Sequence, residues 1–180
     1  MQSAVLVIDV QQGLFNPLPR PWQADDVVAR INTLTSRARA ARVPVIFIQH
    51  TRADEPLSAG SDSWQLQQQL EVAPGDVRIS KTTPDSFFLH TTLQAQLEAI
   101  GAQHLVICGY ASDYCVDTTT RRAAGLGYHV TLAADAHTTH DQPHASAELI
   151  RTHHNATLQN IESFGVPILA RNTAEIEFAA

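Results

Sequence analysis

Cysteine, clustered positive charge and long apolar runs are all scarce in this sequence of 180 residues. Its two cysteines, Cys108 and Cys115, are too few for the disulfide framework of a secreted protein, and we expect free thiols. No apolar run is long enough to span a membrane, and residues 1–3 lead into a short apolar stretch without the features of a signal peptide. We therefore expect a cytoplasmic protein with no membrane partner.

The charge balance argues against a nucleic-acid partner. Lysine and arginine number 12 against 18 aspartates and glutamates, which gives a formal net charge of -6 without any basic run. Phosphate backbones are bound by clustered positive charge, and this sequence has none. The hydrophobic fraction of 44% and the charged fraction of 17% exclude a disordered or fibrous chain. A chain of this length predicts one domain, residues 1–180.

Short β-branched runs alternate with amphipathic stretches along the chain. Strands are expected at residues 4–8, 45–48, 77–81, 104–108, 128–133 and 166–169. Helices are expected at residues 24–41, 93–100, 113–124 and 145–158, with a weaker helical pattern at 64–70. This alternation is typical of an α/β fold in which helices cover both faces of a parallel sheet, a three-layer α/β/α arrangement like the Rossmann fold.

Polar residues stand at the ends of several expected strands. Asp9 follows the first strand, His50 follows the second, and Lys81 ends the third. The turn at residues 109–115 follows the fourth. Ligands of open α/β sheets bind beyond the carboxyl ends of the strands, so an acid, a base and a thiol are expected at one edge. The polar stretch at 51–75 is long enough to line or cover such a site.

Cys115 lies in a turn between a strand and a helix, where Ser112 or Asp113 is expected to cap the helix. A thiol in the first helical turn is near the positive end of the helix dipole and near unpaired N–H groups, which favours the thiolate. We therefore expect the pKa of Cys115 to lie below that of a free thiol. Cys108 lies inside an apolar strand, where a free cysteine usually packs as a small apolar residue.

The other two candidates have ordinary structural interpretations when taken alone. A carboxylate at a strand end, such as Asp9, often caps the following turn, and most lysines, Lys81 included, are expected to be solvated. Taken with Cys115, the three side chains have complementary roles. The thiol gives up a proton, Asp9 accepts it and passes it on, and Lys81 stabilises both anions. The backbone N–H groups of Ala111 and Cys115 are candidates for an oxyanion hole.

Three motifs, in order along the chain, resemble those of the isochorismatase-like cysteine hydrolases, which include nicotinamidases, N-carbamoylsarcosine amidases and ureidoacrylate amidohydrolases. The motifs are Asp9-Val10-Gln11 with Leu14-Phe15, Lys81 with Ser86-Phe87-Phe88, and Gly109-Tyr110-Ala111-Ser112-Asp113-Tyr114-Cys115-Val116. The resemblance extends over about residues 5–139. It implies a six-stranded, mostly parallel sheet and a homo-oligomer of two or more subunits. It also implies a catalytic triad of Asp9, Lys81 and Cys115 and a cis peptide between Tyr110 and Ala111.

The sequence departs from the nicotinamidases of this family at the end of the second strand, where they carry an acid-x-His metal motif. Gln49-His50-Thr51 stands there instead, so we expect no metal and no other cofactor. The spacing of His140 and His144 suits a metal, but Pro143 breaks the helix that would align them, and we expect a solvated loop. We place no histidine of the C-terminal third in the site.

The retained Cys115 separates this chain from the true isochorismatases of the family, which act on a vinyl ether and lack the thiol. We therefore expect metal-independent hydrolysis of a small-molecule amide through a thioester on Cys115. The alternatives are vinyl-ether hydrolysis with Asp9 as the acid, and a catalytically silent oligomeric scaffold with a blocked pocket. The candidate pocket side chains are Gln11, Phe15, His50, Trp64, Phe87 and Tyr114.

Overall fold

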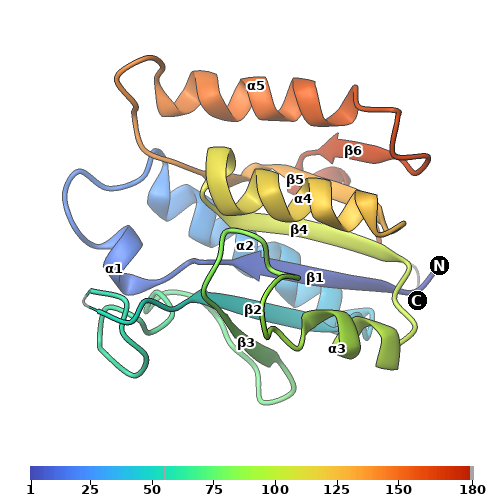
Figure 1. Cartoon of the computed structure of the whole chain (residues 1–180), viewed down its shortest axis with the longest axis horizontal. Coiled ribbons are helices and arrows are strands. Elements are labelled where there is room, and N and C mark those ends of the chain that lie inside the picture. The colour runs from blue at the N-terminus through green and yellow to red at the C-terminus, as the bar shows by residue number, and fades with distance from the viewer. Residues whose placement is uncertain (55, 179–180) are drawn as a thin grey trace.

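The computed structural model describes residues 1–54 and 56–178, and its centre is a sheet of six parallel strands (Figure 1). The strands are β1 (Ser3–Ile8), β2 (Val45–His50), β3 (Val77–Lys81), β4 (His104–Tyr110), β5 (His129–Thr138) and β6 (Ile168–Arg171). They lie in the order β3-β2-β1-β4-β5-β6, and every neighbouring pair is parallel. The predicted α/β fold with a six-stranded sheet is confirmed.

Helices cover both faces of the sheet and give three layers (Figure 1). They are α1 (Gln12–Phe15), α2 (Ala24–Ala40), α3 (Leu93–Ala99), α4 (Asp117–Gly125) and α5 (Ala147–Gln159), with a π-helical turn η1 (Ser112–Val116) and a 3-10 turn η2 (Thr173–Glu175). On one face α2 packs in a cluster with Val5 and Val7 of β1. On the other face α3, α4 and α5 contribute to the cluster that holds Leu6 and Ile8. None of the helices in the described residues has the length and apolar character needed to cross a membrane.

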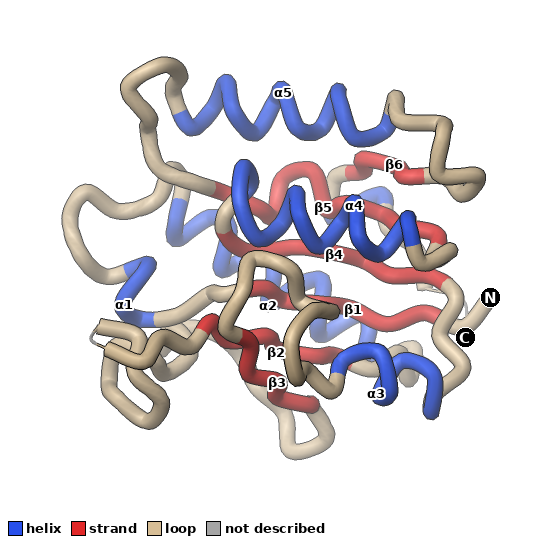
Figure 2. Tube along the Cα trace, in the orientation of Figure 1, coloured by secondary structure: helices blue, strands red, loops and turns tan. Residues whose placement is uncertain are grey.

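Coverage of both faces explains the unbroken apolar character of β1 and β2. Their interior residues are buried, as expected for strands without a solvent-facing side. Polar residues begin where these strands end, because the backbone there leaves the covered part of the sheet. Figure 2 shows long loops gathered at this edge, on the left of the view. The fold therefore surrounds the predicted site with irregular segments.

The helix expected at residues 64–70 does not form. The Gln67 N–H donates instead to the Val10 carbonyl at 2.9 Å, and Leu66 pairs with Gln11 in an isolated antiparallel bridge. These bonds hold the segment against the loop that follows β1. Tertiary pairing thus outweighs a weak local helical preference.

The start of the helix that follows β4 also differs from the prediction. The chain passes through η1 before α4 begins at Asp117. The N-cap residue of η1 is Ala111, which makes no side-chain cap hydrogen bond. The hydroxyl of Ser112 lies 2.8 Å from Nδ1 of His137, so a buried imidazole engages the group that was expected to cap the helix. The predicted cap by Ser112 or Asp113 is therefore wrong.

Candidate active site

The carboxyl ends of β1, β2 and β3 bring the predicted polar residues together. In the pairing of β2 with β3, His50 lies opposite Lys81. The central strand β1 lies between β2 and β4, and Asp9 follows it directly. The chain leaves β1 toward α2 on one face of the sheet and leaves the neighbouring β4 toward α4 on the other face. Open α/β sheets bind their ligands at such a position.

Asp9 is held in an unusual backbone conformation beside Lys81. Its φ of 51° lies in the left-handed region, which a non-glycine residue keeps only when its surroundings fix it. The Asp9 N–H donates to the Ile48 carbonyl at 2.8 Å, and the Asp9 carbonyl accepts from the Gln11 N–H at 2.9 Å. Oδ2 of Asp9 lies 2.7 Å from Nζ of Lys81, and both side chains are almost fully buried. Oδ1 is buried and has no hydrogen-bond partner among the described residues.

The Lys81 ammonium group contacts the other candidate side chains as well. Nζ lies 3.2 Å from Sγ of Cys115, 3.3 Å from Nδ1 of His50 and 3.1 Å from the Thr83 carbonyl oxygen. Because an ammonium group only donates hydrogen bonds, Nδ1 of His50 accepts. Burial, together with the Lys81 charge, lowers the pKa of His50. The His50 ring is therefore neutral near neutral pH.

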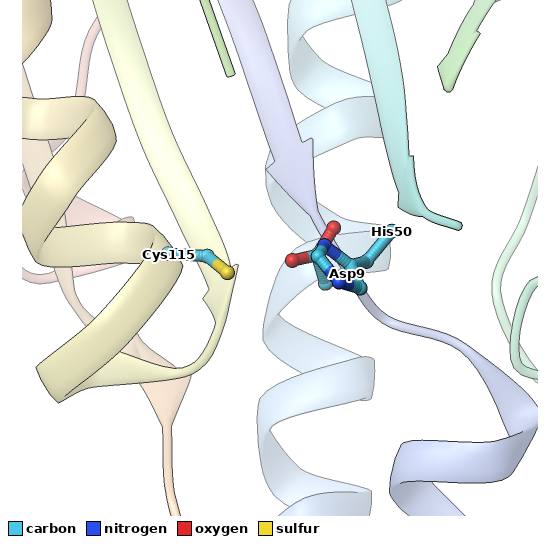
Figure 3. Close-up of side chains that lie close together, drawn as sticks. All are labelled: Asp9, His50 and Cys115. Carbon is cyan, nitrogen blue, oxygen red and sulfur yellow. The ribbon is translucent and has the colours of Figure 1, made fainter. Parts of the chain in front are cut away.

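Cys115 reaches this cluster because β4 and β1 approach each other closely. Gly109 has a φ of 116°, and a Cβ there would collide with the backbone of Ile8. Only glycine therefore lets the chain turn at this point. The following turn η1 presents the Cys115 side chain toward Asp9, as Figure 3 shows.

The backbone of the same turn frames the approach to Cys115. The peptide bond between Tyr110 and Ala111 is cis. The Ala111 carbonyl accepts hydrogen bonds from the N–H groups of Tyr114 and Val116 at 3.1 and 3.0 Å. These two N–H groups are therefore engaged. The N–H groups of Ala111 and Cys115 remain the candidates for contact with a ligand.

The surroundings of Cys115 raise its pKa. Burial is the main cause and the Asp9 carboxylate adds to it, while Lys81 acts in the opposite direction, and the pKa of Cys115 rises to about 12. The expected low pKa is therefore wrong, and the thiol keeps its proton. Cys108 is fully buried in the core, so its predicted packing role is confirmed, and burial raises its pKa too.

A cavity of about 270 Å³ opens onto the cluster. It is lined by Asp9, Leu14, His50, Leu57, Pro84, Tyr110, Ala111, Tyr114 and Cys115. Of the predicted pocket side chains, His50 and Tyr114 are in this wall. Leu57 belongs to the stretch 51–75, which therefore does line the site as expected. Such a small, largely apolar space suits a small uncharged group.

Two further pocket candidates, Gln11 and Trp64, are not among the residues that line the cavity. The buried amide of Gln11 donates to the carbonyls of His50 and Trp64 at 3.1 and 2.8 Å and accepts from the His50 N–H at 2.8 Å. The Trp64 indole N–H donates to the Thr51 hydroxyl at 2.8 Å. Both side chains therefore tie the loop after β2 to the end of that strand.

The last two pocket candidates pack into the core. Phe15 lies edge-on to Tyr110, with ring centroids 5.8 Å apart, and so supports one wall residue from behind. Phe87 stacks on Tyr128 at a centroid distance of 5.9 Å. Tyr128 precedes β5, at the amino edge of the sheet, so this contact lies away from the cavity.

A metal ion fits these residues poorly. Asp9, His50 and Cys115 each offer one possible ligand atom, and the three atoms lie within 4.8 Å of one another. However, Nζ of Lys81 lies within 3.3 Å of an atom of each of these side chains. A buried ammonium group repels a cation placed beside it. These residues therefore favour the lysine as the resident positive charge.

His140 supports the cavity wall through its contact with Tyr110. His144 is exposed as expected, but His140 is half-buried. Its ring lies 2.9 Å from the Tyr110 hydroxyl through Nδ1 and 2.9 Å from the Pro19 carbonyl oxygen through Nε2. The solvated loop predicted for His140 is therefore wrong. Local sequence carries no signal for such contacts, because the partners are distant along the chain.

Comparison with known proteins places this geometry in a family. The isochorismatase domain model matches residues 3–170. Streptothricin hydrolase of Streptomyces noursei is 36% identical over 144 residues, which are 79% of this chain and 52% of that protein. The chain thus spans about half the length of the curated streptothricin hydrolases that it matches. Nicotinamidase 3 of Arabidopsis thaliana is 31% identical over 182 residues, which are 93% of this chain and 83% of that protein.

A solved structure of an isochorismatase family protein has the same fold. It superposes with a TM-score of 0.86 at 33% sequence identity and covers 94% of this chain and 98% of its own. The family-model match over residues 3–170 extends over nearly the whole six-stranded sheet, whose strands run from Ser3 to Arg171. The chain therefore belongs to the isochorismatase family.

Proposed function

We propose that this protein is a metal-independent hydrolase that cleaves a small-molecule amide through a thioester on Cys115. The observation that carries the proposal is the position of Lys81, whose Nζ lies 2.7 Å from Oδ2 of Asp9 and 3.2 Å from Sγ of Cys115. One ammonium group thus joins a proton acceptor to a nucleophile. The names of the relatives, streptothricin hydrolase and nicotinamidase, support hydrolysis.

Acylation begins when the Cys115 thiol passes its proton to Asp9, whose Oδ1 has no hydrogen-bond partner within residues 1–54 and 56–178. The sulfur attacks the amide carbonyl carbon, and the N–H groups of Ala111 and Cys115 stabilise the resulting oxyanion. Loss of one such donor typically costs about a hundredfold or more in rate. Asp9 then gives the proton to the leaving amine as the C–N bond breaks. The raised pKa of Cys115 fits this order, since a protonated thiol needs a base during attack.

Deacylation uses the same groups in the reverse direction. Asp9 accepts a proton from a water molecule while the water oxygen attacks the thioester carbonyl carbon. The C–S bond breaks, the carboxylic acid leaves, and Asp9 returns the proton to the sulfur of Cys115. Lys81 remains charged and stabilises the Asp9 carboxylate and the thiolate in turn.

A panel of small amides and matched esters tests the proposal. Released ammonia, amine or alcohol is measured, and intact-protein mass spectrometry detects an acyl adduct. Cys115→Ala is expected to abolish both turnover and adduct, whereas Cys108→Ala keeps both, because Cys108 packs in the core away from the cavity. Turnover by Cys115→Ala with an inactive Asp9→Asn variant would contradict the thioester and indicate vinyl-ether chemistry. A wild-type protein that hydrolyses nothing and forms no adduct would indicate a silent scaffold.

We further propose that the protein is cytoplasmic and forms a homo-oligomer. Both cysteines are free, as a reducing compartment keeps them. Leu18, Tyr114 and Leu149 expose much of their apolar surface on the subunit, and self-association would cover such groups. Light scattering on the purified protein measures the assembly mass, and the mass of one subunit would contradict the second part of this proposal.

A further inference from the structure

A series of hydrogen-bonded side chains connects the turn that carries Cys115 to α5. The Ser112 hydroxyl lies 2.8 Å from Nδ1 of His137, at the end of β5, and Nε2 of His137 lies 2.8 Å from Oδ1 of Asn155, on α5. The Asn155 amide nitrogen donates to the Ala134 carbonyl at 2.9 Å. Ser112 and His137 are completely buried. None of these residues lines the cavity, and the proposed chemistry uses none of them.

The donor and acceptor of each hydrogen bond in this series follow from its last member, the Ala134 carbonyl, which can only accept. The Asn155 amide group therefore donates to it and turns its oxygen toward His137. That oxygen also only accepts, so Nε2 of His137 carries the hydrogen. Burial lowers the pKa of His137, so its ring is neutral near neutral pH; Nδ1 then accepts, and the Ser112 hydroxyl donates to it. A single arrangement of hydrogens satisfies all three bonds.

From this geometry we infer that Ser112, His137 and Asn155 are positioning residues for Cys115, which they hold in place without touching the substrate. The inference rests on the proposed function. Ser112 is the first residue of η1, and the N-cap residue makes no side-chain hydrogen bond to the turn. The bond from Ser112 to His137 is therefore the side-chain link that fixes the start of η1 to the sheet. π-Helical turns are rare and are frequently found at functional sites.

A small displacement of this turn affects two parts of the site together. Cys115 and the N–H groups of Ala111 and Cys115 all move with η1. A shift of about 1 Å in a reacting group can cost roughly a hundredfold in rate. His137 of β5 and Asn155 of α5 thus support the nucleophile through Ser112, and neither residue lines the cavity.

The chain offers a matched control at the opposite edge of the sheet. The Ser3 hydroxyl lies 3.0 Å from Nδ1 of His104, and Nε2 of His104 lies 2.8 Å from the Thr131 hydroxyl. This is again a serine, a histidine and a polar partner across neighbouring strands. Ser3 begins β1, whereas the cavity lies beyond the end of β1. The Ser3→Ala variant therefore tests how much a comparable hydrogen bond contributes to stability when it lies far from the cavity.

The experiment compares Ser112→Ala, Ser112→Thr, Asn155→Ala and Ser3→Ala. The readouts are the rate at which iodoacetamide labels Cys115, located by peptide mass spectrometry, together with kcat, KM and urea unfolding. Ser112→Ala and Asn155→Ala are expected to lower the labelling rate and kcat roughly tenfold to a hundredfold with little change in KM. Ser112→Thr, which keeps the hydroxyl, is expected to restore both rates toward wild type. Ser3→Ala is expected to lose stability only.

The inference would be overturned if Ser112→Ala and Asn155→Ala kept the labelling rate and kcat of the wild type. It would also be overturned if Ser3→Ala lowered these two quantities as much as Ser112→Ala does. Asn155 is only partly buried, so its variant serves if Ser112→Ala does not fold. Labelling of Cys115 requires no substrate. A protein that hydrolyses no amide therefore contradicts the proposed function, while the labelling rates still decide whether the three residues position the thiol.

Discussion

Asp9 and Lys81 form one ion pair but act on the Cys115 thiol in opposite directions. The Asp9 carboxylate helps to raise the pKa of Cys115, whereas Lys81 lowers it. In the proposed mechanism, however, both groups are needed for turnover. The resting reactivity of the thiol and the catalytic rate are therefore separate properties of this site, and single substitutions can distinguish them.

In the Asp9→Asn variant, iodoacetamide is expected to label Cys115 faster near neutral pH, because the pKa of Cys115 falls when the carboxylate charge is removed. Turnover is expected to drop roughly a hundredfold to ten-thousandfold, the usual contribution of general acid–base catalysis. The Lys81→Met variant is expected to show both slower labelling of Cys115 and slower turnover. Each variant breaks a buried ion pair and should lose roughly 3–5 kcal/mol of stability. Circular dichroism is therefore used to check that each variant is folded before its rates are compared. Slower labelling in Asp9→Asn would contradict this account of the thiol.

The same lysine predicts how the site responds to metal. Dialysis of the wild-type protein against a chelator is expected to leave turnover unchanged. Lys81→Met removes the ammonium group that contacts Asp9, His50 and Cys115, and so is expected to bind Zn²⁺ more tightly than wild type by calorimetry. Lost turnover after chelation that zinc or iron restores would show that the wild-type site holds a metal.

At the scale of elements, the close contact of β1 with β4 depends on Gly109. Gly109→Ala is expected to lose more than about 4 kcal/mol of unfolding free energy, because the new Cβ meets the Ile8 backbone in a tightly packed sheet. Gly127 is a matched control, since its φ is also positive, at 90°, but among the described residues no atom beyond its own chain neighbours lies within 4 Å of an added Cβ. Gly127→Ala should lose only about 1–2 kcal/mol. Equal losses of unfolding free energy in the two variants, measured by urea unfolding, would show that contact with Ile8 is not the reason why position 109 requires glycine.

The elements themselves were largely predictable, because buried parallel strands have continuous apolar sequences. The apolar runs therefore predicted where β1, β2 and β3 end, and the polar residues at these ends, Asp9, His50 and Lys81, became candidates for the site. The contact between Ser112 and His137 was not predictable, since it joins η1 to the end of β5 and leaves no local pattern. The pKa of Cys115 was mispredicted because the helix start was considered without the burial around it.

At the scale of the whole molecule, Asp9 and Lys81 are fixed at strand ends and Cys115 is on the turn η1, while much of the cavity wall is on connecting segments. Asp9 and Lys81 stand at strand ends, whereas Leu57 and Pro84 come from irregular segments. Segments of this kind can change without displacing groups fixed to a rigid sheet. The wall could not be derived from sequence for the same reason, since nothing local fixes the direction of a loop side chain. Substrate choice should therefore respond to changes at Leu57 more than the reaction type does.

One buried and two half-buried histidines are expected to make the stability of the fold sensitive to acid. Burial lowers the pKa of His137 from 6.5 to about 4, although its hydrogen bond to Asn155 acts in the opposite direction. Burial also lowers the pKa values of His50 and His104. A histidine of this kind binds a proton more readily in the unfolded chain than in the folded protein. Protonation therefore favours unfolding.

For His137, both states are neutral above about pH 6.5, so this residue leaves stability constant there. Between pH 6.5 and about 4 only the unfolded chain is protonated, and the unfolding free energy is expected to fall by about 3 kcal/mol. Below about pH 4 both states are protonated, and the loss stops growing. Urea unfolding at a series of pH values measures this slope. His137→Asn should be less stable at pH 7, because the bond to Ser112 is altered, but should show a shallower decline across this window. An unchanged decline in His137→Asn would mean that other groups cause the acid sensitivity.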